Sequence, residues 1–200
     1  MRRWYCLILN YFYVTPTSLN MKKHLIFLLL ISPLFSLAQE SDEPSHRDSI
    51  LTQLQRLAGT FEGTMEFSPE DDNQTVFALP CRATTTYDKE RWEYYLEYDE
   101  GAGEKSGGKG DCVVNDEATK MNYDGIIWLI AEFRVYGDTA LIALETDGKE
   151  KRKKTLMRRE ILITSAGFTV TEKVKYLEGE LQGTFFIRNK HILKRTRRRD

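Results

Sequence analysis

The chain has 200 residues, of which 41% are hydrophobic and 12% aromatic, and its formal net charge at pH 7 is −1. This length excludes the very small folds that need metals or disulfides to complete a core, and it suits one domain. Charge is unevenly distributed: residues 39–148 contain 24 acidic and nine basic side chains, whereas residues 149–200 contain six acidic and 16 basic ones. A basic segment is one feature of nucleic-acid binders, but the better explanation is that acidic early strands pair with basic late strands in one sheet. We therefore predict no nucleic-acid partner.

The N-terminal region has the layout of a secretory signal peptide that begins at an internal methionine. Met21-Lys22-Lys23 is followed by a short apolar run over residues 25–35. Ser36-Leu37-Ala38 then places small residues at the two positions that a signal peptidase reads. We predict an upstream extension over residues 1–20, a signal peptide over residues 21–38 and a secreted or periplasmic mature protein.

The apolar run could instead anchor the chain in a membrane, alone or as a hairpin with residues 4–14. Spanning a bilayer takes about 20 apolar residues, and this run is shorter and is interrupted by Pro33 and Ser36. Gln39 and Glu40 follow it, in place of the cysteine that a lipoprotein needs. No stable membrane span is therefore expected after cleavage.

A polar, flexible lead over residues 39–47 precedes a predicted short helix. Asp48 is a suitable N-cap, and Gly59 ends the helical pattern. Four apolar residues between them fall on one helical face: Ile50, Leu51, Leu54 and Leu57.

Beyond Gly59 the hydrophobic period changes to two, which is typical of strands with one buried face. The turn signals Asp124-Gly125, Gly137-Asp138 and Asp147-Gly148 separate several of these strands. The predicted strands cover residues 60–67, 75–87, 91–98, 112–115, 120–123, 126–136, 139–145, 155–164, 168–177 and 181–193. The glycine-rich residues 101–110 are predicted to form a long flexible loop that could cover a binding site.

No helical pattern long enough for a parallel crossover separates these strands, so the sheet is expected to be an antiparallel meander. A meander with one apolar face must close or stack to bury that face, and closure also removes the exposed edges. We therefore predict an all-β fold, an antiparallel up-and-down β-barrel of about eight to ten strands with a short N-terminal helix. The barrel would occupy residues 48–195, followed by a basic tail over residues 196–200. A two-sheet sandwich is the alternative.

The start of the predicted barrel resembles the lipocalin-like (calycin) family. Leu57-Ala58-Gly59 ends the helix, and Thr60-Phe61-Glu62-Gly63 opens the first strand, where the family has a Gly-x-Trp stretch. Phe61 replaces the tryptophan. The resemblance implies an up-and-down barrel whose cavity holds a small, mostly apolar ligand. It also implies that a basic residue late in the barrel, Arg188 or Arg195, packs on Phe61.

Cysteine usage changes after cleavage, because Cys6 is removed and Cys81 and Cys112 remain. An even pair in an oxidising compartment predicts a disulfide between them. Two free, buried thiols are the alternative.

The sequence contains no strong catalytic or metal-binding motif. Residues 103–109 approach a phosphate-binding loop, but Gly110 replaces the required Ser or Thr, and a strand follows rather than a helix. Only His46 and His191 remain after cleavage, so neither a histidine zinc site nor a histidine-dependent triad is expected. Some calycin barrels carry haem, but nothing near His191 supports haem ligation. We predict no metal, cofactor or catalytic residue.

Large aromatic side chains indicate a ligand site, because such sites are mostly apolar with a few placed polar groups. Core filling is the alternative for each aromatic residue. Glu132 and Arg134 interrupt an apolar strand and are either a buried pair or ordinary solvent-facing residues. The candidate ligand-binding residues are Trp92, Tyr94, Tyr98, Tyr123, Trp128, Glu132 and Arg134.

We therefore predict an exported barrel that binds a small apolar or amphipathic molecule without catalysis. One alternative is an envelope protein with a solid barrel core that binds another protein through its outer face. The other is a barrel enzyme that acts through Tyr, Glu and Arg side chains. An open cavity would favour the first over the second, and a strongly shifted carboxylate pKa inside it would favour the enzyme.

Overall fold

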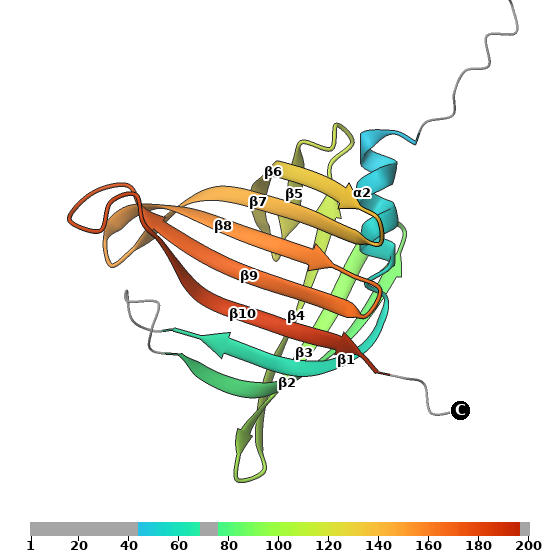
Figure 1. Cartoon of the computed structure of the whole chain (residues 1–200), viewed down its shortest axis with the longest axis horizontal. Coiled ribbons are helices and arrows are strands. Elements are labelled where there is room, and N and C mark those ends of the chain that lie inside the picture. Colours follow the sequence, from blue (N-terminus) through green and yellow to red (C-terminus); the bar gives the residue numbers. More distant parts are fainter. Residues whose placement is uncertain (1–43, 69–75, 197–200) are drawn as a thin grey trace, which may run out of the picture. The chain divides into compact units, whose positions relative to one another are not determined.

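The computed structural model describes residues 44–68 and 76–196. The predicted upstream extension and signal peptide, residues 39–43 of the lead and residues 197–200 of the tail lie outside the described residues. The described part contains one helix followed by ten strands (Figure 1). No helix within it is long and apolar enough to cross a membrane.

The strands form a closed antiparallel barrel in which each strand pairs with its neighbours in sequence and β1 also pairs with β10. This arrangement confirms the predicted all-β, up-and-down barrel with a short N-terminal helix. The strands are β1 (Gly59–Phe67), β2 (Phe77–Asp88), β3 (Arg91–Gly101), β4 (Glu104–Val114), β5 (Lys120–Tyr123), β6 (Ile126–Tyr136), β7 (Thr139–Glu150), β8 (Lys153–Ile163), β9 (Gly167–Tyr176) and β10 (Phe185–Arg195).

Helix α2 (His46–Gln55) begins three residues earlier than an N-cap at Asp48 predicts, because its N-cap is Ser45. The Ser45 hydroxyl accepts the backbone N–H of Asp48 at 3.1 Å and donates to the Asp48 carboxylate at 2.7 Å. A serine that satisfies one of the unpaired N–H groups of the first turn stabilises a helix start. The face of the helix that is buried consists of Ile50, Leu51 and Leu54.

Helix α2 lies across one end of the barrel and is tied to the turns there (Figure 1). Arg47 forms an ion pair with Glu90 of the β2–β3 turn at 2.6 Å. Arg56, just beyond the helix, donates to the backbone carbonyl of Asp138 in the β6–β7 turn. The buried face of the helix therefore closes this end of the barrel, and polar contacts at its rim fix its position.

Arg195 completes the same end. Its guanidinium carbon lies 4.7 Å from the centre of the Phe61 ring, and its nitrogens donate to the backbone carbonyls of Arg56 and Ala58. The resemblance to lipocalin-like barrels predicts this packing of a late basic residue on Phe61. Arg188, the other candidate, forms an ion pair elsewhere in the barrel.

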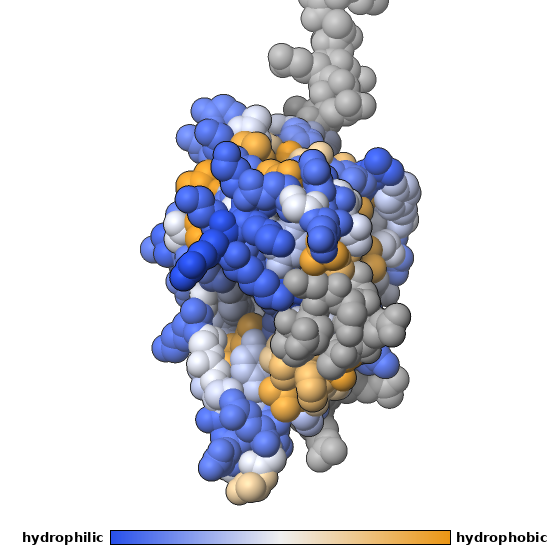
Figure 2. Space-filling model, turned by 90° about the vertical axis from the view of Figure 1, so that its left-hand side faces the viewer, coloured by the Kyte–Doolittle hydropathy of each residue, from blue (hydrophilic) through white to orange (hydrophobic). Residues whose placement is uncertain are grey.

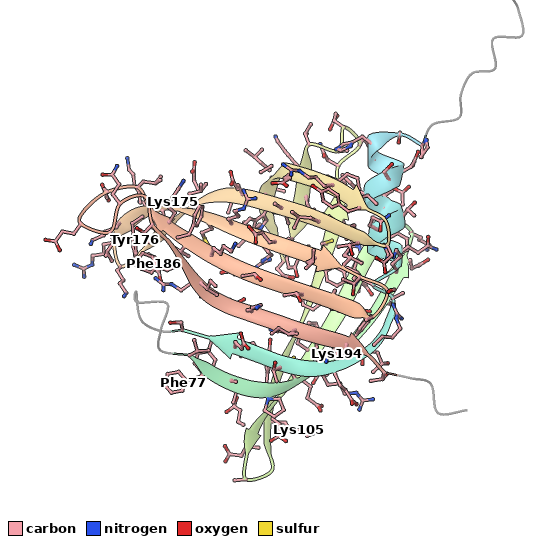
Figure 3. All side chains as sticks on the ribbon, viewed as in Figure 1. Phe77, Lys105, Lys175, Tyr176, Phe186 and Lys194 are labelled. Carbon is pink, nitrogen blue, oxygen red and sulfur yellow. The ribbon has the colours of Figure 1, made fainter. Side chains whose placement is uncertain are left out.

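The glycine-rich residues 101–110 are not the flexible loop that we expected. Most of them belong to β4, which pairs with β3 from Val113 opposite Arg91 to Glu104 opposite Gly101. Strand β5 pairs with β4 only over residues 112–114, so the rest of β4 has a hydrogen-bonded neighbour on one side alone. The two strands therefore form a ribbon that extends beyond the other strands, with Lys105 near its tip (Figure 3).

The β7–β8 turn is also displaced from its predicted position at Asp147-Gly148. It falls at Lys151 and Arg152, whose φ angles of 49° and 66° are the left-handed pair that a two-residue hairpin needs. Gly148 stays within β7, where an added Cβ would lie 2.7 Å from the sulfur of Met157. The glycine thus leaves room for the Met157 side chain of β8 and does not mark a turn.

The uneven charge of the sequence matches the pairing of the first and last strands. Glu62 and Glu66 of β1 lie opposite Lys194 and Lys190 of β10. Opposite charges across a strand pair favour that register. This register supports strand pairing as the explanation of the acidic early and basic late segments.

Buried side chains fill both ends of the barrel. The larger group lies between α2 and the barrel centre and includes Phe61 and Trp128. Tyr176 and Phe186 pack together toward the other end, with ring centres 6.1 Å apart (Figure 3). Viewed from that end, the surface is mostly hydrophilic with a few separate hydrophobic patches (Figure 2).

The predicted disulfide is wrong for this structure, because Cys81 and Cys112 are free, buried thiols. Cys81 lies opposite Tyr98 of β3, whereas Cys112 lies opposite Trp92 of the same strand. The two β3 positions, Tyr98 and Trp92, are six residues apart, which is roughly 20 Å along a strand. A disulfide needs Cα atoms within about 7 Å, so the two cysteines are too far apart to form one. Burial raises the pKa of Cys81 to about 11, as expected for an unreactive thiol.

Candidate functional site

A cavity of about 200 Å³ lies inside the barrel. Inward-facing residues of β2, β3, β9 and β10 provide its apolar wall, because alternate residues of each strand face the interior. This wall consists of Ala83, Trp92, Leu96, Phe168, Val170 and Leu193. The barrel is therefore hollow between its two packed ends.

The cavity also contains a charged pair from two neighbouring strands. Arg159 of β8 lies opposite Glu172 of β9, and its Nη2 donates to the Glu172 carboxylate at 2.7 Å. Only 14% of the Arg159 side chain and 16% of the Glu172 side chain are exposed. Buried charges of this kind are retained in proteins only when they are paired.

Two aromatic rings hold the Arg159 guanidinium in place. Its carbon lies 4.0 Å from the centre of the Tyr123 ring and 4.8 Å from that of the Trp128 ring. Both distances are within the range of cation–π attraction. Nε and Nη1 of Arg159 are buried and have no hydrogen-bond acceptor within the described part of the chain. The guanidinium is therefore oriented by its neighbours while two of its nitrogens stay unpaired.

A hydrogen bond between Tyr94 and Asp124 forms another side of the cavity. The Tyr94 hydroxyl donates to one Asp124 carboxylate oxygen, and the other oxygen accepts the backbone N–H of Asp111 at 3.0 Å. Gly110 lies beneath this contact, where a Cβ would collide with both side chains. Asp124 is exposed, so the cavity reaches the protein surface here. Burial, followed by the proximity of Tyr123, raises the pKa of Tyr94, which therefore stays a neutral donor at pH 7.

His191 of β10 lines the cavity and lies 2.9 Å from the hydroxyl of Tyr98 through its Nε2 atom. Burial, and then the positive charge of Arg159, lower the pKa of His191 to about 4. Burial also raises the pKa of Tyr98 to about 12. The two side chains are therefore an uncharged, hydrogen-bonded pair at pH 7.

The structure places most of the predicted aromatic residues at this cavity. Trp92, Tyr94 and Tyr123 line the cavity, and Tyr98 is hydrogen-bonded to His191, which also lines it. Trp128 is fully buried and contacts Arg159 instead of the cavity space. Their part in ligand binding stays a prediction.

Glu132 and Arg134 lie on the outer face of the barrel. Of the two alternatives for these residues, a buried pair or solvent-facing side chains, the structure shows the second. They bind each other at 2.8 Å, and Glu132 also binds Arg158 at 3.3 Å. Strict alternation from Trp128 would have placed both inside the barrel. A register shift between Ile130 and Glu132 reverses the alternation, so that both charged side chains reach solvent.

Arg159, Glu172 and His191 were not among the predicted site residues. In β8, Arg159 follows Met157 and precedes Ile161 on the inward face. Glu172 is likewise flanked two residues away by apolar residues of β9. In each of these two strands, the charged residue has apolar residues two positions before and two positions after it. This pattern was the sequence signal that could have identified Arg159 and Glu172.

The described ranges, 44–68 and 76–196, contain no cluster of three or more His, Cys, Asp or Glu side chains able to hold a metal ion. Neither a family model nor a curated protein sequence matches this chain. Among solved structures, the chain is similar to Rv2717c from M. tuberculosis, with a TM-score of 0.47 and 14% sequence identity. That similarity covers 74% of this chain and 97% of Rv2717c.

Proposed function

We propose that this protein binds a small amphipathic molecule inside its barrel and does not catalyse a reaction on it. The supporting observation is the cavity of about 200 Å³, which combines an aromatic and aliphatic wall with the buried Arg159–Glu172 pair. Ligand sites are typically apolar with a few fixed polar groups. A dry cavity of about 150 Å³ binds benzene, so this cavity suits a molecule of about one six-membered ring with a short substituent.

A screen of one-ring compounds tests this proposal. Binding would be followed by chemical-shift changes in ¹H–¹⁵N spectra, and we expect the largest changes at cavity residues. Leu96→Trp should fill the cavity and abolish binding of every compound. Tyr95→Trp adds the same side chain at a position that is 43% exposed on the same strand, and it should leave binding unchanged. Compounds that bind equally well to both variants would contradict an internal site.

We also propose that the protein acts outside the cytoplasm, because residues 21–38 have the pattern of a signal peptide. N-terminal sequencing of protein recovered from its own host should begin at Gln39. Recovery of an intact chain from the membrane fraction, beginning at Met1, would contradict this proposal.

A second candidate function is binding of another envelope protein through the outer face of β6. Ile127 and Leu129 are each 55% exposed there, and Ile126 is 50% exposed. Neighbouring exposed apolar side chains are a feature of protein contact surfaces. Replacing Ile127 and Leu129 with Ser should abolish co-purification of such a partner and leave small-molecule binding intact. Unchanged co-purification would contradict this candidate.

A further inference from the structure

We infer that the ligand of this cavity is uncharged and presents a carbonyl-type oxygen to Arg159. This inference depends on the proposed function and names the chemical class of its ligand. Three properties of the interior lead to it: the hydrogen-bonding groups that lack partners, the balance of charge and the available space.

The unpaired polar groups of the interior are almost all donors. Among the described residues, the buried side-chain atoms without a partner are Nε1 of Trp92, Nε1 of Trp128, Oγ1 of Thr155, and Nε and Nη1 of Arg159. Indole and guanidinium nitrogens donate and never accept. Of the nearby carboxylates, Glu172 accepts from Arg159 through one oxygen, and Asp124 accepts from Tyr94. Of the residues with unpaired donors, Trp92 and Arg159 line the cavity, so a ligand that completes their hydrogen bonds must bring an acceptor.

The charge of the interior is already balanced without a ligand. Arg159 and Glu172 neutralise each other, and His191, whose pKa burial lowers to about 4, is uncharged at neutral pH. Asp124 adds a negative charge at the exposed side of the cavity. A ligand carboxylate would lie close to the Glu172 carboxylate, where solvent screens poorly, and a cationic ligand would face Arg159. A ligand with an uncharged acceptor is repelled neither by the carboxylate nor by the guanidinium.

The available space limits the ligand to about one ring. The cavity of about 200 Å³ exceeds the roughly 150 Å³ that holds benzene by enough for a short polar substituent. The ring would pack against Trp92 and Phe168, whose planes are nearly perpendicular at 84°. An oxygen on a short substituent would then reach the guanidinium at the polar side of the cavity.

Three compounds of similar size separate these requirements at pH 7: acetophenone carries a neutral carbonyl, ethylbenzene carries no acceptor, and benzoate is an anion. We expect acetophenone to bind about tenfold more tightly than ethylbenzene, because it gains a hydrogen bond to a charged donor. Benzoate should bind more weakly than acetophenone. In ¹H–¹⁵N spectra, the Nε–H resonance of Arg159 should shift with acetophenone and stay in place with ethylbenzene.

Arg159→Lys keeps the positive charge beside Glu172 but removes the planar set of donors. It should abolish the preference for acetophenone and retain binding of ethylbenzene. Arg158→Lys is the matched control, because Arg158 lies next in sequence but forms its ion pairs with Glu132, Glu145 and Glu160 on the outer face. This variant should keep the preference.

The outcomes distinguish this inference from the proposed function. Failure of all three compounds to bind would refute internal binding of small molecules altogether. Ethylbenzene binding as tightly as acetophenone, or benzoate binding most tightly, would refute the neutral-acceptor inference alone. An unshifted Arg159 Nε–H resonance in the acetophenone complex would also overturn it, and this measurement does not depend on whether the lysine variant folds.

Discussion

Removal of one member of the Arg159–Glu172 pair should destabilise the barrel more than replacement of both members by apolar side chains. In Arg159→Met the Glu172 carboxylate, which is 16% exposed, keeps its position and loses its counter-charge. Breaking a buried ion pair costs about 3–5 kcal/mol, whereas apolar replacement of both partners is neutral or stabilising by about 1–4 kcal/mol. Because both side chains retain some solvent contact, we expect about 2–4 kcal/mol for each single variant. The double variant, Arg159→Met with Glu172→Leu, should lie within about 1 kcal/mol of the wild type.

Urea denaturation of the wild type, both single variants and the double variant would complete a double-mutant cycle for the free energy of unfolding. Tryptophan fluorescence and circular dichroism should give coincident transitions, because the cycle requires two-state unfolding. If the double variant loses the sum of the two single effects, the side chains do not compensate each other and the buried-pair argument fails. A double variant that is stable but no longer binds acetophenone would link the pair to binding and not to folding.

Three further predictions follow from the geometry of the site. Gly110→Ala should destabilise the protein by about 1–3 kcal/mol, because its Cβ would collide with the Tyr94–Asp124 contact. Gly108→Ala on the same strand has open space and should be close to neutral in the same denaturation assay. His191 has its pKa lowered to about 4 in the folded protein, so the unfolded chain binds more protons below about pH 6.5. Stability should therefore fall by at most about 3 kcal/mol as pH decreases from 6.5 to 4, and His191→Gln should flatten that slope. Cys81 and Cys112, which are free and buried, should resist alkylation in the native state and both react after denaturation without reductant; a protected pair would restore the disulfide hypothesis.

Alternation and turn residues made the barrel predictable, and the errors occur where local geometry departs from those rules. Asp124-Gly125 was recognised as a turn, and its φ angles of 55° and 79° are those of a two-residue hairpin. The Lys151-Arg152 turn adopts the same left-handed geometry without glycine or asparagine, so its sequence carries no such signal. In β4, the high glycine content led to the prediction of a loop where the structure has a strand. At least two of them are there because neighbouring groups approach too closely for a Cβ: Gly107 beside the backbone of Leu96, and Gly110 beneath Tyr94.

The site was only partly predictable for a related reason. Alternation correctly placed Trp92 and Tyr94 on the inner face, because β3 is regular over that stretch. Strict alternation would have placed Glu132 on the inner face, but a single register shift in β6 reverses the orientation of every later side chain. The pairing of Arg159 with Glu172 depends on the register between two strands, and single-strand patterns contain no information on register.

Several departures from ordinary core packing coincide in the middle of the barrel. The unfilled space, the buried ion pair and the unpaired guanidinium nitrogens all occur around Arg159. Packing alone would favour apolar side chains there, because a buried pair gains little stability over well-packed hydrophobic residues. Sequences tend to violate local rules at functional sites and to obey them elsewhere. The end closed by α2 is packed by those ordinary rules, whereas the end at the Tyr176–Phe186 cluster has an ion pair of its own, between Arg188 and Glu150. The contrast between the packed α2 end and the polar, hollow middle is the arrangement that the proposed internal ligand would need.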